Sequence, residues 1–261
     1  MNIAVVASGF LGDTIACTAA ASSLHDEFGY QVDFFCKWGQ LISPLQCEPR
    51  FNSYLYKDSK IGQYILNRKL SRYDRVIKEP FTWSYKEPFT SEIRRLANCN
   101  PHSKLDLNLV SNQDLIKKEK LLVSVSKNLY SRNYGRNIDD FISKLGKKFN
   151  IRWVGLEVGK ETKKGQNVSM EDDLVTMLKS QMFIGPEDGL LSIATALGIP
   201  TVYFSEHINH VNSVIKSGNA WMSLGAENIN GTNTNKCLPL GCSNHEAVQE
   251  ILNHYSSIRN S

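Results

Sequence analysis

Acidic and glycine residues after a predicted strand form the first candidate site in this chain. The turn Gly185–Gly189 carries the carboxylates Glu187 and Asp188, and Ser192 follows one helical turn later. Open parallel sheets bind ligands at the carboxyl ends of their strands, where a helix start presents N–H groups and a positive dipole end to an anion. Two carboxylates repel phosphate, so they suit a ribose, a sugar hydroxyl or a cation. The alternative is that the glycines only form the turn, Asp188 only caps the helix and Ser192 only packs.

A basic loop is the second candidate site. The stretch Ser126–Arg136 follows a predicted strand and contains the cations Lys127, Arg132 and Arg136 beside hydroxyl groups and a glycine. This composition suits a diphosphate, because Arg offers forked donors and Lys a point charge. A solvated basic loop explains the same residues equally well.

The third candidate is the first glycine turn, Ser8–Asp13. Its spacing is G-x-x-G rather than G-x-G-x-x-G, and no acidic residue ends the second predicted strand, so the pattern does not indicate NAD binding. Asp13 stands at a predicted helix start. There it is either a partner of the helix dipole or a general base aimed between two domains.

Strand and helix patterns alternate along the whole chain, which predicts parallel α/β sheets. The predicted strands are Ile3–Ala7, Gln31–Phe35, Ser53–Tyr56, Arg75–Ile77, Leu121–Ser124, Ile151–Leu156, Met182–Ile184 and Thr201–Phe204. The predicted helices are Asp13–Phe28, Leu41–Leu45, Ile61–Leu70, Ser91–Ala97, Ile138–Lys147, Glu171–Ser180, Leu190–Leu197 and His245–Tyr255. Gly29 and Gly198 are predicted helix ends, and residues 209–241 are expected to form long loops.

These elements predict two Rossmann-like domains whose parallel sheets face each other across a cleft. We expect an amino-terminal domain over residues 1–115 and a second domain over residues 116–242. We expect the helix in residues 243–261 to be capped by Ser243 or Asn244 and to pack back on the first domain.

Composition places the chain among globular proteins: 261 residues are 41% hydrophobic and 21% charged, with a net charge of +4. No apolar run approaches the roughly 20 residues of a membrane helix, and the start predicts a buried strand rather than a signal peptide. We therefore expect a cytoplasmic protein without a membrane span. Cys17 and Cys36 are expected in the core, while the pair Cys237 and Cys242 lacks a second pair at zinc-site spacing.

The order of these motifs resembles glycosyltransferase family 9, the ADP-heptose:lipopolysaccharide heptosyltransferases. The pair Gly12-Asp13 with the helix from Thr18 to Leu24 resembles the family's G-D pair and T-P-x-L-x-x-L-like helix. The run Phe183–Val202 resembles its G-x-[DE]-x-G-x-x-H-x-A-A-A-L-G-x-P-x-V signature. Ser131-Arg-Asn-Tyr134 is similar to its S-K-R-W loop. Ser192 stands where the family usually has His, and Ala19 where it has Pro.

The resemblance implies a GT-B fold and an inverting, metal-independent transfer from a nucleotide-diphosphate-sugar to an acceptor hydroxyl. It implies no cofactor, favours an ADP-sugar as donor and suggests a glycan or lipopolysaccharide-like acceptor. Asp13 would be the catalytic base and Glu187 would lie near the donor sugar. The implied donor and diphosphate site consists of Gly12, Lys127, Ser131, Arg132, Glu187, Asp188, Gly189, Leu190 and Ser192.

Two other functions are open from the sequence. One is a nucleotide-sugar-binding protein that has lost catalysis. Ser192 favours it, as does a first domain that is short for the family the chain resembles. The other is a transferase that glycosylates a base in nucleic acid, because the chain is mildly basic and carries aromatic residues before its middle. These aromatics are Tyr73, Phe81, Trp83 and Tyr85, for which packing at the domain edge is the alternative.

Overall fold

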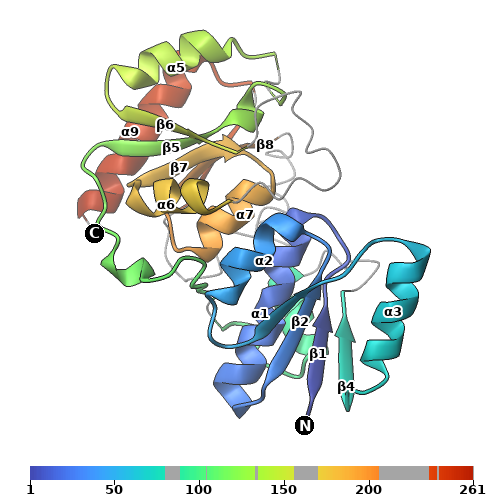
Figure 1. Cartoon of the computed structure of the whole chain (residues 1–261). Coiled ribbons are helices and arrows are strands. Elements are labelled where there is room, and N and C mark those ends of the chain that lie inside the picture. The colour runs from blue at the N-terminus through green and yellow to red at the C-terminus, as the bar shows by residue number, and fades with distance from the viewer. Residues whose placement is uncertain are drawn as a thin grey trace.

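The computed structural model contains two parallel sheets, each with helices on both faces (Figure 1). It describes residues 1–79, 89–103, 105–132, 135–155, 170–205, 235–239 and 241–260. One sheet lies within residues 3–78 and the other within residues 122–239. The predicted α/β class with two Rossmann-like sheets is therefore confirmed.

The first sheet has the strand order β3-β2-β1-β4, with all strands parallel. Its strands are β1 (Ile3–Val6), β2 (Val32–Cys36), β3 (Asn52–Leu55) and β4 (Arg75–Lys78). Its helices are α1 (Leu11–Phe28), α2 (Gly39–Gln46), α3 (Lys60–Leu70) and α4 (Phe89–Leu96). Side chains alternate between the two faces of each strand. Ile3 and Val5 therefore pack into the core with α1, whereas Ala4 and Val6 meet Leu66 of α3 on the other face.

The second sheet has the order β6-β5-β7-β8-β9, and its strands are also parallel. The strands are β5 (Leu122–Ser126), β6 (Asn150–Val154), β7 (Met182–Pro186), β8 (Thr201–Ser205) and β9 (Asn235–Pro239). The helices that the structure describes here are α5 (Ile138–Gly146), α6 (Glu171–Lys179), α7 (Gly189–Ala196) and α9 (Asn244–Asn260). In both sheets the order reverses beside the first strand, at β1/β4 and at β5/β7. Such reversals are where doubly wound sheets hold ligands.

The predicted strands and helices all occur, with boundaries within two residues of the expected ones except at the carboxyl end of α9. Strand β9 was missed, since residues 209–241 were expected to be loops. Its sequence shows no alternation, and Asn235 instead joins β8 through a side-chain oxygen that accepts from Thr201 N at 3.1 Å. Gly185 and Pro186 belong to β7 rather than to the turn, because Gly185 still pairs with Tyr203 of β8.

The carboxyl-terminal helix α9 packs on the second sheet, and the expected packing on the first domain was wrong. Ala247, Val248, Ile251 and Tyr255 lie in one apolar cluster with strands β5, β7 and β8 and with α5. Figure 1 shows α9 in red beside α5, far from the first sheet. The helix start is capped by Ser243, whose hydroxyl accepts from Glu246 N at 3.2 Å.

The two domains share one continuous apolar core. Helix α1 of the first domain packs against α7 of the second, and their buried side chains belong to a single cluster. A backbone hydrogen bond of 2.9 Å from Leu107 N to Ala196 O joins the segment that follows α4 to the end of α7. The close packing of two helices rich in Ala, Ser and Thr needs small side chains at the contact. That composition is visible in both helix sequences.

Candidate functional site

Asp13 lies in the first turn of α1, directly after the carboxyl end of β1. Its Oδ2 accepts from the backbone N–H of Phe10 at 2.9 Å, which closes the start of the helix. Burial raises the pKa of this carboxyl group, while the Phe10 N–H and the charge of Lys37 act in the opposite direction. A partly buried carboxylate with a raised pKa at a strand end suits a general base.

A second carboxylate, Glu79, lies beside Asp13 and was missed by the sequence analysis. It follows β4, and its Oε2 accepts from Ser8 N at 2.6 Å and from Gly9 N at 2.7 Å. Burial raises the pKa of Glu79, the two N–H donors lower it, and the charge of Asp13 raises it again. Glu79 therefore holds the glycine turn and faces the candidate base.

The lack of a side chain at Gly9 makes this arrangement possible. A Cβ atom there would lie 2.2 Å from Glu79 Oε1 and 2.6 Å from Asp13 Oδ2. Trp38 fixes the same turn from the end of β2 by donating Nε1–H to Gly9 O at 3.1 Å. The G-x-x-G turn thus places two carboxylates at one point, where the sheet order reverses.

Asp188 caps α7 at the corresponding point of the second sheet. Its Oδ1 accepts from Leu190 N at 2.9 Å and from Leu191 N at 3.1 Å. Its Oδ2 accepts from Asn128 Nδ2 at 2.6 Å and from Ser126 Oγ at 3.4 Å. Burial raises the pKa of Asp188, while these amide donors and Arg132 oppose the rise. Asp188 is thus the link between the loop after β5 and the start of α7.

The cap that Asp188 forms on α7 uses an N–H group that the sequence resemblance assigns to a phosphate. The Leu190 N–H, expected to face a phosphate, donates to Asp188 Oδ1 in this structure. Ser192 is buried, and its Oγ donates to Asp188 O at 3.5 Å. Whether Asp188, Gly189, Leu190 and Ser192 meet a donor phosphate stays a prediction.

The basic loop after β5 lies against the acidic turn. Arg132 donates from a guanidinium nitrogen to Glu187 O at 2.7 Å, and Ser131 Oγ donates to Asn128 O at 3.0 Å. Lys127 is partly exposed at the end of β5, and both Ser131 and Arg132 are exposed. These three side chains can therefore reach a diphosphate from one edge of the second sheet.

Arg136, the third cation of the predicted loop, has a different role. Its guanidinium donates to Asn244 Oδ1 at 2.9 Å and to Cys242 O at 2.8 Å. It also lies 4.7 Å from the centre of the Phe204 ring. Arg136 thus joins the start of α9 to the sheet.

The fold brings the two halves of the predicted site together. Helices α1 and α7 start at the carboxyl ends of β1 and β7, and these starts meet: a Cβ on Gly189 would lie 2.7 Å from Leu11 Cβ. Leu11 is two residues from Asp13, and Gly189 follows Asp188 directly. Figure 1 shows both helices at the junction of the two domains. The structure therefore brings the start of α1, which carries Asp13 and the buried Gly12, against the start of α7, which follows Glu187 and Asp188.

Several residues named in the sequence analysis lie outside the described residues. These are Phe81, Trp83, Tyr85 and Tyr134. Tyr73, in contrast, packs edge-on against Phe35 at a centroid distance of 6.0 Å and hydrogen-bonds Asp33, as the packing alternative requires.

Cys17 and Cys36 are buried in the core as expected. Within the ranges that the structure describes, no three His, Cys, Asp or Glu side chains are grouped to hold a metal ion. Among the described helices, none has both the length and the apolarity to cross a bilayer.

No protein-family model and no curated protein matches this chain. Solved structures do: the heptosyltransferase WaaC of E. coli, determined with ADP-2-deoxy-2-fluoro heptose, matches with a TM-score of 0.64 at 11% identity over 97% of this chain and 99% of WaaC. The glycosyl transferase family 9 protein of Veillonella parvula matches with a TM-score of 0.55 at 10% identity over 98% of this chain and 97% of that protein. This chain has the heptosyltransferase fold. The predicted GT-B architecture of facing Rossmann-like domains is thereby confirmed.

A third match defines a difference in length. TibC, an iron-containing dodecameric glycosyltransferase of enterotoxigenic E. coli H10407, matches with a TM-score of 0.54 at 12% identity over 78% of this chain. The chain spans 58% of the length of TibC. At identities of this order the shared property is the fold, and function has to be argued from the site.

Proposed function

We propose that this chain is an inverting, metal-independent glycosyltransferase that moves a sugar from a nucleotide-diphosphate-sugar to the hydroxyl of a saccharide acceptor. One observation carries the proposal. The carboxylate of Asp13 and the cationic loop of Lys127 and Arg132 belong to different domains whose helix starts meet at Leu11 and Gly189. A sugar held at this junction has a base on one side and cations on the other.

This placement supports a transfer that inverts the configuration of the anomeric carbon. Asp13 accepts the proton of the acceptor hydroxyl as its oxygen attacks the anomeric carbon, and the bond to the nucleotide diphosphate breaks on the opposite face. A single displacement of this kind inverts the anomeric centre. The raised pKa of Asp13 makes it a stronger base than an ordinary aspartate.

The leaving diphosphate gains negative charge as the bond breaks. Lys127, Ser131 and Arg132 supply two positive charges and a hydroxyl group at the carboxyl edge of the second sheet. Fixed donors and cations aimed at developing charge lower the barrier of such a step. We assign Glu187, whose backbone oxygen already meets Arg132, to the hydroxyl groups of the donor sugar.

We propose an ADP-sugar as the donor to test first and a glycan or lipopolysaccharide-like acceptor. WaaC was solved with ADP-2-deoxy-2-fluoro heptose and TibC with ADP-D-beta-D-heptose, which supports this choice. Reaction in the cytoplasm stays a prediction.

A protein that binds nucleotide-sugar without catalysis is the second candidate. Ser192, which replaces the usual His, is buried against Asp188 O rather than aimed at solvent. The nucleic-acid alternative stays a prediction. Tyr73 packs within the first domain, and Phe81, Trp83 and Tyr85 lie outside the described residues.

Thermal unfolding against ADP-, UDP-, GDP- and CDP-sugars without metal tests the proposal. A ligand at 100 times its Kd adds about 2.7 kcal/mol to the free energy of unfolding, which is a clear shift in Tm. We expect a shift with one nucleotide, followed by release of its diphosphate when saccharide acceptors are added. Binding without release on any acceptor favours the second candidate. No shift with any donor contradicts both.

A further inference from the structure

An exposed apolar surface covers one side of the first domain, away from the junction of the domains. It consists of the edge strand β3 and the helix α3, and its side chains are Tyr54, Leu55, Ile61, Tyr64 and Ile65. Ile61 is 74% exposed and Tyr64 66% exposed. Ile61, Tyr64 and Ile65 stand at positions i, i+3 and i+4, so they form one stripe on the helix.

The fold explains why this stripe is left in solvent. Leu66 and Leu70 on the opposite side of α3 already pack into the apolar cluster with Ala4, Val6 and Phe35. Among the described strands β3 lies at the edge of the sheet, so none of them pairs with Tyr54 and Leu55 on the outer side. A cavity of about 470 Å³ between Leu55, Ile61 and Ile65 marks where the helix and the edge strand meet.

Cations surround this apolar stripe. Residues 54–72 contain five of them and a single acid, Asp58, so this segment carries a charge of +4, equal to the net charge of the whole chain. The five cations are Lys57, Lys60, Arg68, Lys69 and Arg72. Asp58 forms its ion pair with Lys37 at 3.5 Å. Within the described part of the chain, none of the five cations is in an ion pair.

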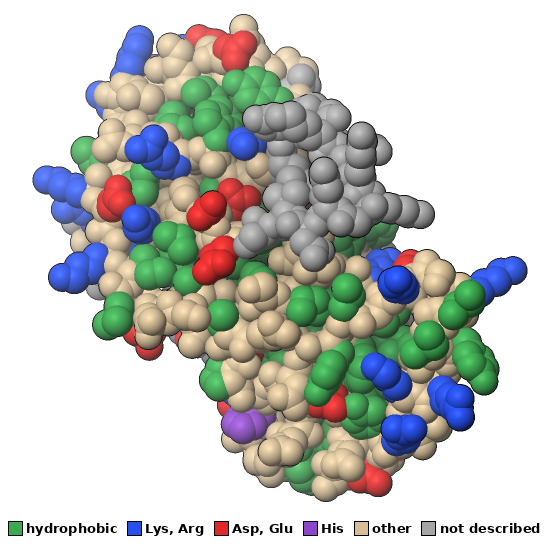
Figure 2. Space-filling view, viewed as in Figure 1, with side chains coloured by type: hydrophobic (Ala, Val, Ile, Leu, Met, Phe, Trp, Pro, Cys, Tyr) green, Lys and Arg blue, Asp and Glu red, His purple; other side chains and the backbone are tan. Residues whose placement is uncertain are grey.

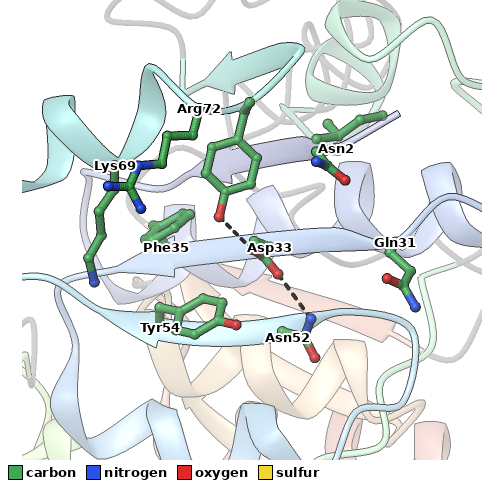
Figure 3. A pocket seen from close by; sticks show the side chains of 10 residues that line it. Asn2, Gln31, Asp33, Phe35, Asn52, Tyr54, Lys69 and Arg72 are labelled. Carbon is green, nitrogen blue, oxygen red and sulfur yellow. Dashed lines mark hydrogen bonds between the residues drawn. The ribbon is translucent and has the colours of Figure 1, made fainter.

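Figure 2 shows green hydrophobic and blue basic side chains together over the α3 side of the first domain, at the lower right. A second cavity of about 490 Å³ lies where α3 ends, with Lys69 and Arg72 on its rim (Figure 3). Asp33 lines this cavity too and accepts hydrogen bonds from Tyr73 and Asn52, and within the described residues it forms no ion pair with Lys69 or Arg72. Both cations are exposed to solvent.

We propose that this α3 surface, the five apolar side chains with the five cations, docks the protein on an anionic phospholipid membrane. Exposed apolar side chains flanked by Lys and Arg are the composition with which helices lie in the lipid headgroup region. Interfaces between proteins are depleted of Lys, whereas three of the five cations here are Lys. The helix lies flat on such a surface, and Ile61, Tyr64 and Ile65 enter it.

Sedimentation with phospholipid vesicles tests the proposal on the full chain. We expect binding to phosphatidylcholine vesicles that contain phosphatidylglycerol, weak binding to phosphatidylcholine alone, and release at high salt. The variant Lys69→Gln with Arg72→Gln loses two cations, each worth roughly fivefold in partitioning. The variant Ile61→Ser with Ile65→Ser loses the apolar contacts and should no longer sediment with the vesicles.

The matched control is Lys147→Gln with Lys148→Gln, which removes the same charge from the end of α5 in the second domain. It should bind vesicles like the parent, and all variants should keep the parent Tm because the changed side chains are exposed. Equal loss in the control overturns the proposal, since net charge alone would then explain binding. Absence of vesicle binding at low salt also overturns it, as does a dimer that only Ile61→Ser with Ile65→Ser abolishes. None of these outcomes depends on donor binding, so the proposed function is judged separately.

Discussion

Glu79 Oε1 and Asp13 Oδ2 face the same point in space, the position that a side chain of Gly9 would occupy. That point is 2.2 Å from the first oxygen and 2.6 Å from the second, so the two oxygens are less than about 5 Å apart. Two carboxylates at this distance resist carrying two charges, and they titrate as a pair. The candidate base Asp13 is therefore electrostatically coupled to Glu79, which lies 66 positions away in the chain.

The exchange Asp13→Asn should strongly reduce turnover and preserve donor binding. The amide keeps the size of the side chain and cannot take the acceptor's proton, so kcat should fall by roughly 10²- to 10⁴-fold. Release of nucleoside diphosphate gives kcat, and the thermal shift with donor gives binding. Turnover equal to the parent's would remove Asp13 from the role of base.

The exchange Glu79→Gln should move the acidic limb of the pH–kcat/KM profile to lower pH. The charge of Asp13 is among the causes that raise the pKa of Glu79, so the two carboxyl groups titrate as a pair. Removing one carboxyl group lets the remaining one ionise in more acidic solution. The amide oxygen can still accept from Ser8 N or Gly9 N. A limb that stays in place, or moves to higher pH, contradicts the pairing of the two carboxylates.

The exchange Gly189→Ala should loosen the junction of the domains. The new methyl group would lie 2.7 Å from Leu11 Cβ and Cδ2, so α7 and α1 must separate. We expect a loss of about 1–2 kcal/mol in the free energy of unfolding, after the better helix propensity of Ala is counted.

A double-mutant cycle with Leu11→Ala isolates this clash. The pair Gly189→Ala with Leu11→Ala should be more stable than the sum of the two single effects predicts. Leu11→Ala removes Cγ and Cδ2, two of the three atoms that the new methyl group would meet, and keeps Cβ. If the two changes in the free energy of unfolding, measured with denaturant, are strictly additive, there is no steric clash between the starts of α1 and α7.

The exchange Glu48→Gln should destabilise the first domain by about 3 kcal/mol at neutral pH. Glu48 is buried and pairs with Arg50 at 2.6 Å, and its Oε2 accepts from Asn108 N at 2.8 Å. Burial by itself raises the pKa of Glu48, but Arg50 and the Asn108 N–H outweigh it and lower that pKa below the usual 4.5. Urea unfolding of the parent and the variant measures the difference.

The sign of the pH dependence follows from that lowered pKa. The native state holds a proton on Glu48 less tightly than the unfolded state, so the stabilisation is present above pH 4.5 and is lost as the pH falls through the native pKa. The difference in the free energy of unfolding between the parent and Glu48→Gln should therefore become smaller as the pH falls below 4.5. Glu250→Gln is the matched control, because its pair with Lys236 is exposed and should be worth less than about 1 kcal/mol at any pH. If Glu48→Gln changes the free energy of unfolding as little as Glu250→Gln does, the buried ion pair of Glu48 with Arg50 does not stabilise the first domain.

Local patterns determined most of the secondary structure. The small apolar residues of α1, the stop at Gly29 and the strand–turn–helix sequence of Met182–Ala196 act within one or two helical turns, so they are visible without a fold. Asp13 was predicted for the same reason, since both its helix start and the glycines before it are neighbours in sequence.

Tertiary structure decided which of these residues meet. Glu79 contacts Ser8 across 71 positions only because β4 pairs with β1, and Asn128 contacts Asp188 across 60 positions only because β5 pairs with β7. Strand order is set by how whole elements pack, and no short-range pattern encodes it. The exposed stripe of α3 has the same origin. Ile61 and Leu66 are both apolar, and only the position of the sheet determines which one is buried.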